Sequence, residues 1–198
     1  MQSALPSQSG LTHSAKSLQE SIPGKAIIII AASLFVAVCA HVSLPLPFTP
    51  VPITLQTFAV VLVGMLLGPT AGFAAMLAYL AEGASGFPVF SPHGPGGLAQ
   101  LLGPTGGFLF SYPAAAAIAG WVVRGKRVIP SRFALAATAG VLSSVVVFSL
   151  GAGWLMLCAH NSASLAWHMA VAPFLPGDAV KIVAAASIFS SLQRWPRR

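Results

Sequence analysis

Long apolar stretches alternate with short polar connections along most of this chain. A single α-helix needs roughly 20 apolar residues to cross the hydrocarbon of a bilayer, and four stretches approach or reach that length. They comprise residues 26–42, 108–123, 133–159 and 171–192. We predict that each of them forms a membrane-spanning helix.

Two shorter apolar pieces, residues 53–67 and 71–80, lie between the first two of these stretches. The dipeptide Gly68-Pro69 separates them, and proline ends a helix before it or begins one after it. We therefore predict two helices at this place, which brings the total to six. The expected fold class is an all-α integral membrane protein with six transmembrane helices.

The composition favours the same class. Of the 198 residues, 56% are hydrophobic and only 7% are charged, whereas soluble domains contain about 25% charged residues. So few charges cannot cover a surface that faces water on all sides. The composition therefore excludes an ordinary soluble protein.

The basic residues lie at alternate connections between the predicted helices. Lys and Arg collect on the cytoplasmic side of short connections, and here they precede the first helix, separate the fourth from the fifth and follow the sixth. The other three connections, residues 43–52, 82–105 and 160–170, contain no Lys or Arg. We expect a multi-pass protein of the cytoplasmic membrane with both termini in the cytoplasm.

This topology also predicts the domain organisation. Residues 1–25 are expected to form a flexible cytoplasmic tail, residues 26–193 the six-helix membrane domain, and residues 194–198 a basic cytoplasmic tail. The net charge of +7 follows from the topology and from attraction to acidic membrane lipid. It therefore predicts no nucleic-acid partner.

Two opposite charges, Asp178 and Lys181, lie inside the last apolar stretch. Charges in a membrane segment are costly and usually serve a function. A spacing of three residues places both side chains on one face of a helix, so both can point into one pocket. The alternative is structural: Asp178 follows Pro-Gly, where it could cap the helix, and Lys181 could merely neutralise it.

The connections on the outer side carry further candidates for a binding site. Prolines in residues 43–52 favour a stiff, extended segment, and Thr54 and Gln56 follow it as polar residues that could contact a ligand or only satisfy backbone groups. Glycines in residues 86–97 allow backbone amides to point at a ligand. Within that segment, Phe90 offers an apolar wall and His93 a possible contact for an anionic group.

Three separated motifs resemble those of the BioY family, the biotin-specific S components of energy-coupling factor (ECF) transporters. The motifs are PVPITLQT at residues 50–57, FPVF at 87–90 leading to GPTGG at 103–107, and PGD at 176–178 with Lys181. The resemblance covers about residues 26–192. It implies the ECF S-component fold, a biotin pocket open to the outside, and partnership with a transmembrane coupling subunit and ABC-type ATPases.

The candidate residues suit the ligand that the resemblance implies. Biotin presents two ureido N–H donors, one ureido carbonyl, an apolar thioether ring and a carboxylate. An ionised Asp178 can accept from the ureido N–H groups, and Lys181 can donate to the carbonyl or meet the carboxylate. Phe90 would contact the apolar ring, with Gln56 and Thr54 as second-rank contacts, and His93 is the alternative cation for the carboxylate.

The sequence predicts no enzyme, no cofactor and no metal site. It contains no Gly-x-x-x-x-Gly-Lys-Ser/Thr phosphate loop, so transport would need energy from a partner or a gradient. One alternative is therefore a stand-alone small-molecule carrier or facilitator. A remote alternative is a rhomboid-like intramembrane serine protease, because residues 83–86 read Gly-Ala-Ser-Gly, although no predicted helix interior after Ser85 supplies the histidine base that such a serine needs.

Overall fold

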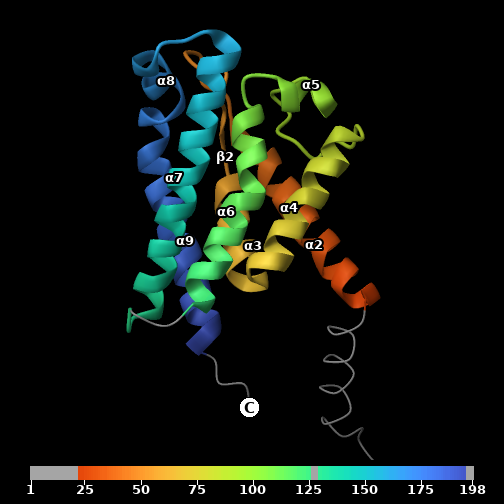
Figure 1. The fold of residues 1–198 in the computed structure, drawn as a ribbon, viewed down its shortest axis with the longest axis vertical. Helices are drawn as coiled ribbons and strands as arrows, with labels where there is room; N and C mark the ends of the chain where they lie inside the picture. Colours follow the sequence, from red (N-terminus) through yellow and green to blue (C-terminus); the bar gives the residue numbers. More distant parts are fainter. Residues whose placement is uncertain (1–21, 126–128, 195–198) are drawn as a thin grey trace, which may run out of the picture.

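The computed structural model describes residues 22–125 and 129–194, almost all of them in or between helices (Figure 1). The predicted tails at residues 1–25 and 194–198 lie mostly outside this part of the chain, so their boundaries stay predictions. The helices are α2 (Ile22–His41), α3 (Gln56–Leu67), α4 (Pro69–Ala84), α5 (Gly97–Leu102), α6 (Gly106–Arg124), α7 (Arg132–Ala159), α8 (Ala163–Ala170), the 3-10 turn η1 (Ala172–Phe174) and α9 (Leu175–Arg194).

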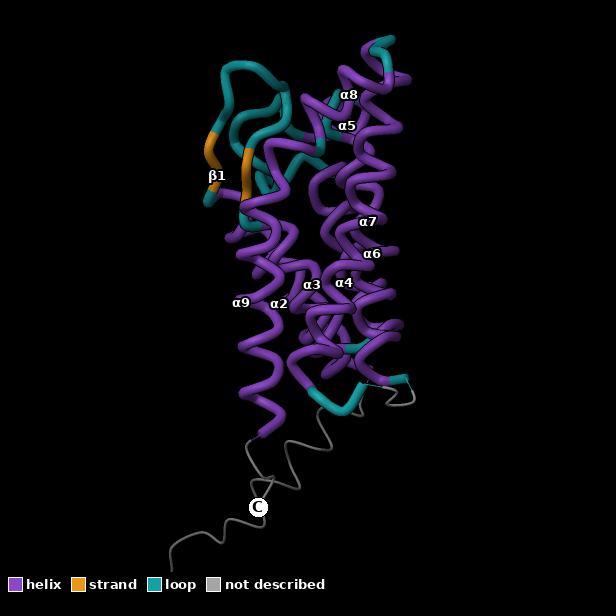
Figure 2. The backbone as a smooth tube through the Cα atoms, turned by 90° about the vertical axis from the view of Figure 1, so that its left-hand side faces the viewer, coloured by secondary structure: helices purple, strands orange, loops and turns teal. Residues whose placement is uncertain are grey.

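The long helices run side by side in alternating directions, so the connections gather at two ends of one bundle (Figures 1 and 2). One end carries the α3–α4 junction, the α6–α7 connection and both described chain ends. The opposite end carries α5, α8 and the two short strands β1 (Ser43–Leu44) and β2 (Ile53–Thr54). We call this second end the loop end.

Four helical stretches have the length and the hydropathy to cross a membrane: Ile22–His41, Gly106–Arg124, Arg132–Ala159 and Ala163–Gln193. They coincide with the four long apolar stretches of the sequence, so that part of the prediction is confirmed. The two shorter pieces also form helices, α3 with 12 residues and α4 with 16. Both are shorter than the roughly 20 residues of a full span, and the count of six crossings stays a prediction.

The predicted break between α3 and α4 is confirmed. Gly68 adopts a φ of 86°, a left-handed conformation that glycine reaches without a steric cost. Its N–H donates to the carbonyl of Gly64 at 2.8 Å, and Pro69 then begins α4. The chain therefore reverses within a single residue.

This tight reversal allows α3, α4 and α6 to approach each other closely. A Cβ atom on Gly64 would lie 2.2 Å from the carbonyl oxygen of Ala116, and one on Gly120 would lie 2.4 Å from the carbonyl carbon of Gly68. Only glycine fits at such backbone contacts, which are typical of helices packed in membranes. The three helices thus form the rigid centre of the bundle.

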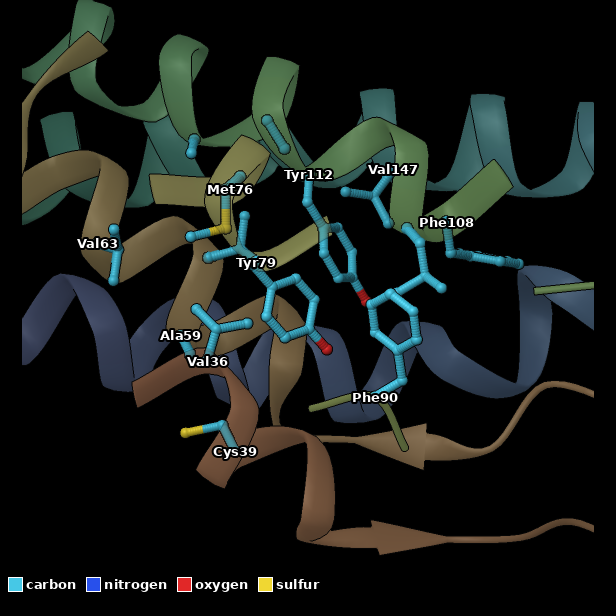
Figure 3. Close-up of a cluster of buried hydrophobic side chains, with 14 of the residues drawn as sticks. Val36, Cys39, Ala59, Val63, Met76, Tyr79, Phe90, Phe108, Tyr112 and Val147 are labelled. Carbon is cyan, nitrogen blue, oxygen red and sulfur yellow. The ribbon is translucent and has the colours of Figure 1, made fainter. Parts of the chain in front are cut away.

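Two clusters of buried apolar side chains surround this centre. The larger one joins α2, α3, α4 and α6 and includes Val36, Met76 and Tyr79 (Figure 3). The smaller one joins α3, α6, α7 and α9 around Met65 and Phe189. Together they fix the positions of the helix ends that surround the site described below.

The connections at the loop end are more structured than the sequence indicates. The proline-rich segment folds back on itself, since β1 pairs antiparallel with β2 through Ser43↔Thr54 and Leu44↔Ile53. The other two connections carry the short helices α5 and α8, which the apolar pattern does not predict because both are short and lie outside the long apolar stretches. These pieces cover the ends of the long helices.

The close approach at Gly120 leads to a first prediction. Gly120→Ala should lower the midpoint of thermal unfolding in detergent, because the added methyl meets backbone atoms that cannot move alone, at a cost of about 1–3 kcal/mol. Gly153→Ala is the matched control: it adds the same methyl to α7 at a position that faces open space among the described residues. Equal midpoints for the two variants would contradict the close packing of α3, α4 and α6.

Candidate ligand-binding site

A cavity of about 590 Å³, open solvent at its mouth included, lies at the loop end of the bundle. Its walls come from α3, α6, α7 and α9 and from the connections above them. The lining residues are Val51, Pro52, Thr54, Gln56, Thr57, Ser91, Gln100, Thr105, Phe108, Leu109, Tyr112, Val147, Phe148, Phe174, Asp178 and Lys181.

Asp178 and Lys181 both line this cavity, as their helical spacing predicts. Asp178 is only 6% exposed, and the side chain of Ser144 on α7 lies beside it. Lys181 donates from Nζ to Oγ1 of Thr57 on α3 at 3.2 Å. Each charge therefore lies next to a neutral hydroxyl on another helix, and both charges face the same space.

The position of Asp178 argues against the capping interpretation. Helix α9 begins at Leu175, after the turn η1, so Asp178 is the fourth residue of the helix and not the residue that precedes it. A carboxylate in the first turn still interacts favourably with the helix dipole. Its burial beside a cavity, however, is not needed for that interaction.

Gln56 and Thr54 form part of the cavity floor through a network of buried hydrogen bonds. Gln56 donates from Nε2 to Oη of Tyr79 at 2.5 Å, and its Oε1 accepts from Thr54 at 3.2 Å and from Tyr112 at 3.3 Å. Tyr79 in turn donates to the carbonyl of Val89 at 3.0 Å. One amide thus joins α3, α4 and α6 directly below the cavity.

The covering connections contribute polar side chains with spare hydrogen-bonding capacity. Ser91 is buried, and its Oγ has no hydrogen-bond partner among the described residues. Gln100 is 4% exposed; its Oε1 accepts from the N–H of Gly96 at 3.2 Å, and no hydrogen bond is recorded for its Nε2 within the described residues. Both side chains line the cavity and could bind a polar group there.

The structure does not bring Phe90 or His93 to this cavity. Phe90 is buried beneath the loop, in edge-to-face contact with Tyr79 at a centroid distance of 5.3 Å (Figure 3). His93 is exposed in the same loop. The apolar lining comes instead from the aromatic rings of Phe108, Phe148 and Phe174.

Sequence reasoning missed several lining residues, namely Ser91, Gln100, Thr105, Tyr112 and the aromatic rings of Phe108, Phe148 and Phe174. Only Tyr112 carried a usable signal, since a phenol within an otherwise apolar helix needs a partner when it is buried. The aromatic rings look like ordinary membrane-facing residues in the sequence. Their place in the cavity depends on how distant helices pack.

Ser85 lacks the surroundings of a catalytic nucleophile. It is exposed, and its Oγ donates to the carbonyl of Ala81 at 2.8 Å. A serine nucleophile needs a base within hydrogen-bond reach, and within the described residues no histidine is hydrogen-bonded to it. The neighbouring Glu82 accepts a hydrogen bond from Ser33 of α2 and lies in a groove beside α2, away from the cavity.

The cavity therefore combines one carboxylate, one ammonium group, neutral donors and an apolar wall. Such a set can hold a small ligand that carries donors, acceptors and an apolar part. It contains no arrangement of nucleophile and base within the described residues. The geometry favours binding over catalysis.

Comparison with known proteins agrees with this interpretation. The family model of the BioY family matches residues 12–198. The chain is 37% identical over 171 residues to a probable biotin transporter BioY of Pyrococcus horikoshii, covering 85% of this chain and 98% of that protein. It is 34% identical to the biotin transporter BioY of Rhodobacter capsulatus, with 85% of this chain and 92% of that protein covered. It is 36% identical to the biotin transporter BioY of Thermotoga maritima, with 84% of this chain and 95% of that protein covered.

A solved structure shares the fold. The crystal structure of the S-component for biotin from an ECF-type ABC transporter matches with a TM-score of 0.78, over 98% of this chain and 96% of that one. The sequence identity between the two is 22%. This likeness confirms the all-helical S-component fold.

The buried pair of charges generates a second prediction. Lys181→Met should lower the midpoint of thermal unfolding of the ligand-free protein, because it leaves the Asp178 carboxylate buried without a nearby cation. Asp178→Asn should lower the midpoint less than Lys181→Met does. The double variant Asp178→Asn/Lys181→Met should have a higher midpoint than Lys181→Met alone. A double variant no more stable than Lys181→Met would show that the two charges do not compensate each other.

Proposed function

Because this chain belongs to the BioY family, we propose that it captures biotin from outside the cell as the substrate-binding S component of an ECF transporter. The single observation that carries this proposal is the cavity in which Asp178 and Lys181 lie together at the loop end of the bundle. The named relatives and the shared fold support the same substrate.

The chemistry of the cavity suits biotin at each of its parts. Asp178 accepts from ureido N–H groups, and Lys181 donates to the ureido carbonyl, so that both charges form charge-assisted hydrogen bonds. The thioether ring rests against Phe108, Phe148 and Phe174. Gln56 adds a neutral donor from below.

We place the biotin carboxylate at the opposite, upper part of the cavity, beside Ser91 and Gln100. The unpartnered Oγ of Ser91 and the Nε2 of Gln100 can donate to it. In this orientation Lys181 serves the ureido ring rather than the carboxylate. A neutral amide of biotin should then bind almost as well as biotin itself.

The proposal includes six crossings of the cytoplasmic membrane with both termini in the cytoplasm. The alternating direction of α2, α3, α4, α6, α7 and α9 supports it (Figure 1). So does the placement of Lys and Arg near the end opposite the cavity. There Arg124 donates to the carbonyl of Leu67 at 2.7 Å and so satisfies a free carbonyl at the end of α3.

Energy for release would come from partner subunits. The sequence has no phosphate loop, and we infer that a transmembrane coupling subunit and ABC-type ATPases drive reorientation of the loaded protein. The apolar outer surface of the helices contacts membrane lipid. The binding step can be measured without these partners.

The proposal is tested by measuring the binding of biotin to the purified chain in detergent with isothermal titration calorimetry. Biotin should bind tightly, 2-iminobiotin, which alters the ureido group, should bind much more weakly, and the neutral biotin amide should bind nearly as well as biotin. No binding of biotin by a folded sample would refute the capture function. Strong loss with the amide would instead place Lys181 at the carboxylate.

A further prediction concerns Asp178. Asp178→Asn should weaken biotin binding by about 5- to 150-fold, since a charge-assisted hydrogen bond to a ureido donor is worth about 1–3 kcal/mol. Glu82→Gln is the matched control, because it makes the same chemical change at a residue outside the cavity, and its affinity should equal that of the wild type. Equal affinities for Asp178→Asn and wild type would remove Asp178 from the ligand contacts.

A further inference from the structure

We propose that Tyr79, which does not line the cavity, is the positioning residue of the site: its hydroxyl fixes the orientation of Gln56 in the cavity floor and fastens the loop that carries Ser91. This inference rests on the proposed function, because the ligand whose binding it controls is biotin. It assigns a role to a fully buried phenol on α4 that makes no contact with the cavity itself.

The direction of the hydrogen bonds at Tyr79 is determined by its partners. The carbonyl of Val89 can only accept, so the Tyr79 hydroxyl must donate to it. The oxygen of that hydroxyl is then left as the acceptor for Gln56 at 2.5 Å. The nitrogen of the Gln56 amide must therefore face Tyr79.

The orientation of Gln56 follows from this constraint. Its Oε1 faces Thr54 and Tyr112 and accepts from both hydroxyls, which uses both lone pairs of the oxygen. The second N–H of Nε2 has no recorded partner among the described residues. Gln56 is thus presented to the cavity as a donor and not as an acceptor, which suits a ureido carbonyl better than an N–H group.

The same hydroxyl anchors the covering loop. Residues 85–88 and 92–95 are exposed, whereas Val89, Phe90 and Ser91 between them are buried. The ring of Phe90 packs on Tyr79 and so closely on Gly83 that a Cβ atom there would lie 2.0 Å from it. The next residue, Ser91, lines the cavity. Tyr79 therefore links the floor of the cavity to its cover.

A loop that is held in place before the ligand arrives needs less ordering on binding. Loss of the Tyr79 hydroxyl should free the Val89 carbonyl and loosen Ser91 over the ligand. The bound ligand would then escape faster. The rate of ligand dissociation, more than that of association, should report the change.

The decisive experiment compares Tyr79→Phe with Tyr112→Phe. Each variant removes one buried hydroxyl that is bonded to Gln56, but only Tyr79 also bonds the loop. Cleavage of the ligand-free protein by chymotrypsin after Phe90 reports loosening of the loop. Cleavage after Phe48, in a different exposed loop, is the internal control.

Tyr79→Phe should accelerate cleavage after Phe90 and dissociation of biotin by about 5- to 30-fold each, as expected for the loss of one buried hydrogen bond. Cleavage after Phe48 should not change. Tyr112→Phe should leave cleavage after Phe90 at the wild-type rate, although it can weaken binding because Tyr112 lines the cavity. Wild-type cleavage or wild-type dissociation in Tyr79→Phe would overturn the inference, as would equal cleavage in the two variants.

If Tyr79→Phe does not fold, a second variant tests whether the anchored loop retains the ligand. Gly83→Ala retains the Tyr79 hydroxyl but displaces the ring of Phe90, and it should likewise accelerate both cleavage after Phe90 and biotin dissociation. Unchanged rates in this variant would overturn the link between the loop anchor and ligand retention. Absence of biotin binding by the wild type would refute the proposed function instead, and the cleavage rates would still test the anchor.

Discussion

The need to satisfy buried polar groups from within the protein determines most of this structure. Hydrocarbon offers no water to an unpaired donor or acceptor, and several polar side chains inside the bundle accordingly meet a partner on another element. Gln56 bonds Tyr79 and Tyr112, and Lys181 bonds Thr57. These bonds connect the helices in addition to the close backbone and apolar contacts between them. Within the described residues the buried hydroxyls of Ser43 and Ser91 have no partner, and Ser91 lines the cavity, where a ligand could supply one.

Close backbone packing and the polar network depend on each other. The reversal at Gly68 and the contact at Gly120 bring α3, α4 and α6 near enough for Gln56 to bond side chains of both other helices. A bulkier residue at Gly120 would separate α6 from the α3–α4 junction. We expect the hydrogen bond from Tyr112 to Gln56, 3.3 Å long here, to weaken as a result. The glycines at one end of the bundle thus help to determine the geometry of the site at the other.

The sequence predicted the features that depend on local patterns and missed those that depend on distant contacts. The long apolar helices, the break at Gly68 and the shared face of Asp178 and Lys181 follow from composition and helical spacing, and the structure has all of them. Phe90 was expected to contact the ligand because it is aromatic and lies in the connection between α4 and α5, at the loop end. Its actual place, against Gly83 and Tyr79, is set by contacts within the folded loop. Gln100 was missed for the same reason, since nothing in its neighbours marks it as buried.

The position of the two charges explains how a site in a membrane protein can be both stable without ligand and ready to bind it. Asp178 and Lys181 each have a neutral hydroxyl nearby, since Ser144 lies beside Asp178 and Lys181 donates a hydrogen bond to Thr57. A close ion pair would have to be broken before a ligand could use either charge, at a cost in free energy that the ligand would have to offset. A neutral hydroxyl beside each ion offsets part of the free-energy cost of its desolvation. It leaves the charge free to interact with a ligand. Under the proposed function, both charges thus remain in the apolar interior and are free to form charge-assisted hydrogen bonds with biotin.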